Sequence, residues 1–134
     1  MFPSRAPFFR DRLSARRVAT AAARAGGTVI VSAISPYAET RAKARALAEE
    51  VGAQFVEVHV ATSVDECARR DVKGLYEKAF KGEITEFTGV SDPYEEPSNP
   101  ELVIDTELHE PDESAQLILQ HLEERGLVPA GVTA

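Results

Sequence analysis

The chain has 134 residues, of which 43% are hydrophobic, a size and composition typical of one soluble domain. Its net charge of −7 argues against nonspecific binding to nucleic acid or to anionic membranes, because both need a basic surface. The charge is uneven: residues 1–50 contain nine Arg or Lys against four Asp or Glu, and residues 51–134 contain six against eighteen. A negatively charged ligand would therefore need locally placed cations.

Cysteine content and hydropathy predict the compartment. Cys67 is the only cysteine, so an intrachain disulfide is impossible and a reducing cytoplasm is expected. No apolar run approaches the roughly 20 residues that span a bilayer, and the N-terminus lacks the apolar core of a signal peptide. We expect a cytoplasmic protein without a membrane partner.

The first half of the chain alternates helical and strand patterns. Residues 1–10 read as an irregular lead-in. The alanine-rich run from Asp11 to about Ala25 predicts a helix that ends at Gly26-Gly27. The β-branched run Thr28–Ile34 predicts a strand covered on both faces, as in a parallel sheet. A second helix is predicted from about Ala38 to Val51.

The second half continues this alternation. Strands are predicted at Gln54–Val60 and Glu101–Asp105, a capped helix at Ser63–Arg70, and a final helix from Pro111 to Gly126. This order predicts a single α/β domain over residues 1–134, with layers of helices around a mainly parallel sheet. Ligands of such sheets bind beyond the carboxyl ends of the strands. His59 has no partner at metal-ligand spacing, so we predict a packed histidine and no metal site.

The segment Arg70–Pro97 combines lysines, aromatic residues and glycines, and we name it the lid. Lysines can contact an anion, ring faces can stack on a base, and glycines allow a hinge or close backbone approach. The simpler interpretation is an amphipathic helix over roughly Gly74–Lys81 that packs Leu75, Ala79 and Phe80 on a core, with its lysines in solvent.

Four strings, in this order, resemble the adenylylsulfate kinase family over roughly residues 28–128. They are VIVSAISPY (Val29–Tyr37), FVEVHVATSVDECARRD (Phe55–Asp71), DVKGLYEKAFKGEITEFTGVSDPYEEP (Asp71–Pro97) and NPELVIDT (Asn99–Thr106). The resemblance implies a P-loop kinase-like three-layer α/β/α fold. It also implies transfer of phosphate from ATP to the 3′-hydroxyl of adenylylsulfate, with ATP and Mg²⁺ as cofactors.

The resemblance assigns roles within the lid. Lys73, Phe87 and Thr88 match positions that contact adenylylsulfate, Phe87 by stacking on adenine and Lys73 by its charge. Arg70, at the entry of the lid, matches a position on the ATP side.

Two further residues match positions at the end of a strand. Ile34 and Ser35 correspond to positions lining the substrate site, and Ser35 is described in the family as a phosphoserine intermediate. Kinases of this fold transfer the phosphoryl group directly, so the chemistry favours a substrate contact for Ser35.

The family's P-loop motif, G-x-x-x-x-G-K-[ST], does not occur in these 134 residues. The resemblance then implies that the central P-loop strand is missing on the N-terminal side of the sheet. We therefore predict that the chain alone has negligible kinase activity. The alternatives are a non-catalytic module that binds adenylylsulfate or its 3′-phosphorylated product, or a truncated gene product. Expected partners are adenylylsulfate, a second copy, or ATP sulfurylase.

Overall fold

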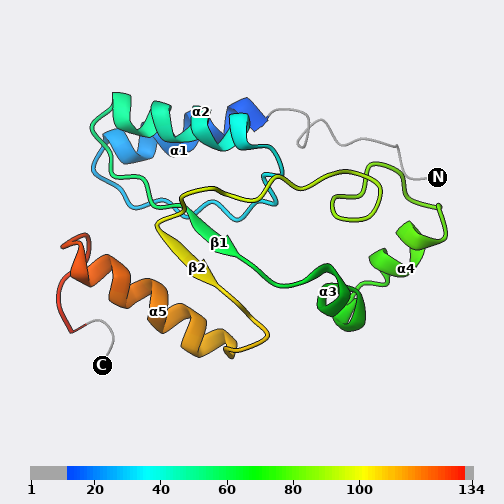
Figure 1. The fold of residues 1–134 in the computed structure, drawn as a ribbon. Helices are drawn as coiled ribbons and strands as arrows, with labels where there is room; N and C mark the ends of the chain where they lie inside the picture. Colours follow the sequence, from blue (N-terminus) through cyan, green and yellow to red (C-terminus); the bar gives the residue numbers. More distant parts are fainter. Residues whose placement is uncertain (1–11, 132–134) are drawn as a thin grey trace. The chain divides into compact units, whose positions relative to one another are not determined.

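The computed structural model describes residues 12–131, which divide into two compact units between Phe55 and Val56. The first unit contains α1 (Arg12–Arg24) and α2 (Ala38–Glu50). The second contains, in chain order, β1 (Val58–Val60), α3 (Val64–Arg70), α4 (Leu75–Phe80), β2 (Leu102–Ile104) and α5 (Pro111–Glu124) (Figure 1). The predicted lead-in, residues 1–10, lies outside the described residues. The assignment of residues 1–134 to one domain stays a prediction.

In the first unit, α1 packs against α2, and both helices end as predicted. The backbone N–H of Gly26 donates to Ala23 at 2.9 Å, with Gly26 in the left-handed region at φ +84°. Glycine favours this conformation because it has no Cβ, so it stops the helix. An exposed i,i+4 ion pair between Glu39 and Lys43 supports α2.

The predicted strand at Thr28–Ile34 is wrong. No described residue pairs with this segment, and its apolar side chains are largely exposed, Ile30 to 91%. A β-branched sequence favours extended backbone, but the hydrogen bonds that make a strand come from a neighbouring strand. Within residues 12–131 that neighbour is absent, so the segment has no regular secondary structure.

In the second unit, β1 and β2 form a parallel pair, as predicted. His59 lies opposite Val103, and Val60 opposite Ile104. Both strands are shorter than predicted because pairing extends over only three residues. α5 lies beside β2 (Figure 1), and Ile104 is 2% exposed, the most buried large side chain among the described residues. The core of this unit is therefore centred on Ile104.

Caps fix the starts of two helices of the second unit. The Ser63 hydroxyl accepts from the backbone N–H of Glu66 at 3.2 Å, which starts α3. A reciprocal cap between Glu110 and Glu113, with Pro111 in the first turn, starts α5. No helix among residues 12–131 is both long and apolar enough to cross a membrane.

Candidate functional site

Polar side chains meet where β1 and β2 end. The hydroxyl oxygens of Thr62, after β1, and Thr106, after β2, are 2.5 Å apart. The hydroxyl and backbone N–H of Ser63 both donate to a Glu107 carboxylate oxygen, at 2.6 and 3.1 Å. Parallel strands bring their carboxyl ends to one edge, so the loops that follow β1 and β2 lie together. This network was not predicted from the sequence. A sequence signal for it exists, because Thr62-Ser63 follows β1 and Thr106-Glu107 follows β2.

Arg70 ties α3 to this edge. Its guanidinium donates to the hydroxyl and the carbonyl oxygen of Thr106, at 2.9 and 2.8 Å, and to Glu66 at 2.6 Å. Arg69 makes a second, bidentate contact with Glu66. A hollow of about 370 Å³ lies beside these residues, lined by Glu66, Arg69, Arg70, Thr106, Glu107, Leu108, His109 and Glu110. The predicted approach of Arg70 to ATP stays a prediction.

Hydrogen bonds from Arg69 and Arg70 lower the pKa of Glu66 from its ordinary value of 4.5 to about 2. Because the folded-state pKa is the lower one, ionised Glu66 stabilises the fold fully above pH 4.5. This stabilisation is lost as the pH falls toward 2. We therefore expect Glu66→Gln to reduce stability at pH 7, and the difference from the parent protein to disappear between pH 4.5 and pH 2.

Urea unfolding at a series of pH values measures this difference. The exposed Glu83→Gln is the control for loss of one carboxyl group, and it should have little effect at any pH. A Glu66→Gln deficit that is equally large at pH 7 and at pH 2 would contradict the role assigned to the ion pairs.

Asp71 forms the hinge between α3 and α4. Its carbonyl oxygen accepts from the N–H of Gly74 at 2.8 Å, and its carboxylate accepts from the N–H groups of Tyr76 and Glu77, at 3.0 and 3.1 Å. Partial burial opposes ionisation of Asp71, but these backbone hydrogen bonds outweigh it, so its pKa lies below the ordinary value. The capped hinge carries the predicted contact residue Lys73, which is exposed to solvent.

Three aromatic rings gather in the lid. The Tyr76 and Phe87 rings meet edge to face, with centroids 4.9 Å apart and planes at 76°. Phe80 is farther from Tyr76, at 6.4 Å, and is 62% exposed. The predicted helix at Gly74–Lys81 therefore exists as α4. Of the three side chains predicted to pack on a core, Ala79 is buried, but Leu75 is 38% and Phe80 62% exposed, so the prediction is wrong for these two. The ligand-binding interpretation of the lid stays a prediction.

A tight turn over residues 87–92 holds Phe87 and Thr88. The Phe87 N–H donates to the Ser91 hydroxyl at 2.8 Å, and the Phe87 carbonyl accepts from the N–H groups of Val90, Ser91 and Asp92. The turn contacts α3 at Gly89, where an added Cβ would lie 3.2 Å from Val64 Cγ2. Phe87 and Thr88 are thus half-buried on a fixed backbone.

Ile34 and Ser35 lie in the first unit. Ser35 has φ +43°, in the left-handed region, and its carbonyl oxygen accepts from Arg41 Nη1 at 2.7 Å. Ile34 is exposed. The structure describes this unit and the lid separately, so it does not test whether Ile34 and Ser35 join the lid residues at one site.

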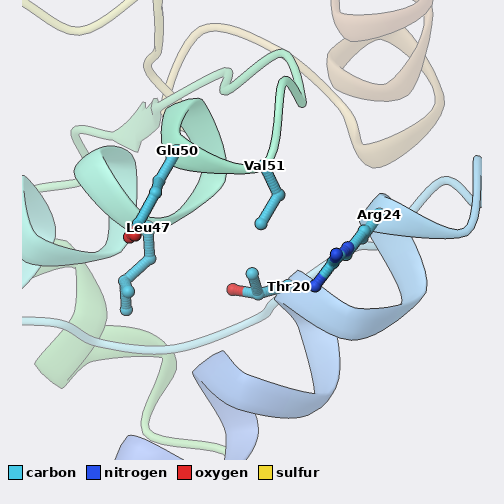
Figure 2. A pocket seen from close by; sticks show the side chains of 5 residues that line it. All are labelled: Thr20, Arg24, Leu47, Glu50 and Val51. Atoms are coloured by element: carbon cyan, nitrogen blue, oxygen red, sulfur yellow. The ribbon is translucent and has the colours of Figure 1, made fainter.

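A second hollow, of about 450 Å³, lies between α1 and α2. Figure 2 shows its lining side chains, which come from both helices and the residue that follows α2: Thr20, Arg24, Leu47, Glu50 and Val51. No sequence motif indicates this hollow, although the i,i+4 spacing of Thr20 and Arg24 places both on one face of α1. Its mixed polar and apolar lining indicates no particular ligand.

His59 and Cys67 both pack against other parts of the chain. His59 stacks on Tyr94, with ring centroids 5.9 Å apart, as predicted for a packed histidine. Cys67 is half-buried in α3. Among residues 12–131, no three His, Cys, Asp or Glu side chains are arranged to hold a metal ion.

The parallel pair of β1 and β2, with a polar carboxyl edge and with the lid between the two strands in the chain, is typical of open-sheet α/β proteins, a class in which ligands bind at that edge. The adenylylsulphate kinase family profile matches residues 9–105, and the chain belongs to this family. This confirms the resemblance stated from the sequence and the incomplete P-loop kinase-like fold class.

Individual relatives agree with this assignment. Adenylyl-sulfate kinase of Myxococcus xanthus is 46% identical over 117 residues, which are 87% of this chain and 63% of the relative. Bifunctional enzyme NodQ of Rhizobium meliloti is 53% identical over 113 residues, 82% of this chain and 17% of the relative. A solved structure, the Mycobacterium tuberculosis APS kinase CysC in complex with AMPPNP and APS, matches with TM-score 0.77 and 47% identity. That match covers 81% of this chain and 62% of that protein. The chain thus spans less than two thirds of each of these relatives.

Proposed function

We propose that this chain carries the adenylylsulfate-binding lid of an adenylylsulfate kinase. We also propose that the whole protein transfers a phosphoryl group from ATP to adenylylsulfate. The observation that carries this proposal is the match, over 81% of the chain, to an APS kinase whose structure contains APS and the ATP analogue AMPPNP. The geometry of the lid supports it, because Asp71 caps α4 and the turn over residues 87–92 holds the family's stacking position.

Three residues of the lid would bind adenylylsulfate. Phe87 would stack on the adenine. The ammonium group of Lys73, on its flexible and solvent-exposed side chain, would contact the phosphosulfate group. Thr88, next to Phe87 in the same turn, would supply a hydroxyl to the same ligand. Ile34 and Ser35 would line the other side of the adenylylsulfate, with Ser35 as a contact. Arg70 would lie toward the ATP phosphates.

The residues present do not fit a Mg²⁺–ATP site. The 134-residue sequence contains no glycine-rich loop with the lysine and Ser or Thr that hold phosphates and Mg²⁺. The part of the chain that the structure describes also offers no cluster of metal-binding side chains. We therefore expect the 134-residue polypeptide to bind adenylylsulfate without turning it over.

A second candidate function for these 134 residues, which contain the lid motif without a P-loop motif, is a non-catalytic module that senses adenylylsulfate or its 3′-phosphorylated product. The partner of such a module would be ATP sulfurylase or a second copy of this chain. The compartment would be a reducing cytoplasm. One relative, the bifunctional enzyme NodQ, supports association with another catalytic activity. The sequence similar to this chain makes up only 17% of that longer polypeptide.

Calorimetry with adenylylsulfate tests the proposed lid contacts. Phe87→Ala should weaken binding by roughly 5- to 150-fold, because stacking of a base on an aromatic ring contributes about 1–3 kcal/mol. Lys73→Ala should also weaken binding, and more strongly at low salt. Val72→Ala is the matched control: Val72 precedes Lys73, is 93% exposed, and should leave the affinity unchanged.

A coupled assay for ADP release, with the same protein, tests whether these residues catalyse phosphoryl transfer. Binding without turnover is the result expected for the 134-residue polypeptide. ATP-dependent turnover would contradict our expectation about the Mg²⁺–ATP site. Equal affinity of the parent protein, Phe87→Ala and Lys73→Ala would overturn the proposed lid contacts.

A further inference from the structure

Tyr76 contacts residues on both sides of α4, as well as a residue of α3. Its backbone N–H donates to the Asp71 carboxylate at 3.0 Å, which fixes the start of α4. Its ring meets Phe87 at 4.9 Å. Burial and a hydrogen bond with the Cys67 side chain of α3 raise the pKa of its hydroxyl. Tyr76 therefore has contacts in α3, in the hinge and in the turn over residues 87–92.

The backbone and the ring of Phe87 are held by different groups. The turn fixes the Phe87 backbone through the Ser91 hydroxyl and the N–H groups of residues 90–92. These backbone hydrogen bonds do not fix the rotation of the Phe87 side chain. Within the described residues, Tyr76 is the ring that contacts Phe87. A stacking platform must hold its ring plane before the base arrives, because otherwise binding must order it at an entropic cost.

We propose that Tyr76 is the positioning residue that sets the orientation of the Phe87 ring, so that stacking of a purine base on Phe87 depends on Tyr76. The proposal rests on the proposed function, because that function gives Phe87 its ligand. In this role Tyr76 acts on the base through the Phe87 ring that it contacts. Removing its ring should reduce affinity for adenylylsulfate by about 2- to 10-fold, the range expected for loss of one edge-to-face pair.

The chain contains no tryptophan, so Phe87→Trp introduces a unique fluorophore at the ring in question. Time-resolved anisotropy of the introduced indole in the free protein reports the mobility of this side chain without any ligand. In the Phe87→Trp background, we expect Tyr76→Ala to increase the fast, local component of the anisotropy decay. Tyr76→Phe should restore the parent decay, because it keeps the ring and removes only the hydroxyl.

Phe80→Ala is the matched control, since it truncates a ring of the same helix that is 62% exposed. It should leave the anisotropy decay of the indole unchanged. Far-UV circular dichroism and the melting temperature of each variant show whether α4 remains folded. A purely structural role would give a lower melting temperature for Tyr76→Ala without a change in the indole's decay at a temperature where the protein is folded.

Titration with adenylylsulfate completes the test, with Phe87 native and the same substitutions at Tyr76. The expected result is weaker binding by Tyr76→Ala, recovery in Tyr76→Phe, and parental affinity in Phe80→Ala. Unchanged mobility of the indole in Tyr76→Ala would overturn the positioning role. If no variant and no parent protein binds adenylylsulfate, the proposed function fails, while the anisotropy still decides whether Tyr76 orients the ring.

Discussion

Ile104→Ala is expected to lower the free energy of unfolding of the second unit by about 2–5 kcal/mol, the range for truncating a buried isoleucine. Ile104 is 2% exposed, on the strand that α5 packs against, so the surrounding side chains can refill the cavity only in part. Such a loss is a large fraction of the stability of about 5–15 kcal/mol that is usual for a domain. Urea unfolding followed by far-UV circular dichroism measures it.

Val103→Ala is the internal control, because Val103 is the neighbouring residue of β2 and is 55% exposed. It should cost less than about 1 kcal/mol. Ile104→Val should fall between, at about 0.5–1.5 kcal/mol. Equal losses for Val103→Ala and Ile104→Ala would show that the core of this unit lies elsewhere.

Gly89→Ala is expected to destabilise the lid by about 1–3 kcal/mol and to weaken adenylylsulfate binding. Gly89 has φ +87°, which costs an L-residue energy, and its new Cβ would lie 3.2 Å from Val64 Cγ2. Either the turn that carries Phe87 and Thr88 or the Val64 side chain of α3 would have to shift to make room for the methyl group. Thermal unfolding measures the change in stability, and calorimetry the change in affinity.

Gly82→Ala separates these two causes. Gly82 has φ +73° but nothing within 4 Å of an added Cβ, so this variant has the conformational cost without the steric contact. Gly89→Ala should be the more destabilising, and Val64→Ala should reduce the difference in a double-mutant cycle. If both glycine variants lose the same stability, with no coupling to Val64, then the contact between the turn and α3 has no energetic role.

Helices were predictable where short-range signals determine them. The alanine-rich run of α1 stops at Gly26 as expected, and the Ser63 cap starts α3 as expected. Hydrogen bonds of a helix lie within one segment, so composition and caps nearly suffice. The parallel pairing of β1 and β2 was also predictable, because strands alternating with helices favour it.

The segment Thr28–Ile34 shows the limit of such reasoning. Its β-branched sequence predicts a strand, yet no described segment supplies the partner that a strand requires. Ile34 and Ser35 lie at the end of this segment. The sequence matched them to the family's substrate site, but a motif match does not place them relative to the lid.

The sequence by itself determined the family, through the long lid motif, and it matched Lys73, Phe87 and Thr88 to positions that contact adenylylsulfate in that family. Only the tertiary structure revealed how the lid is held: Arg70 bound to Thr106, Asp71 capping α4, and Tyr76 against Phe87. The physical reason is that a motif encodes residue identity along the chain. Ring contacts and guanidinium hydrogen bonds join residues 11 and 36 positions apart, so they exist only after the chain has folded.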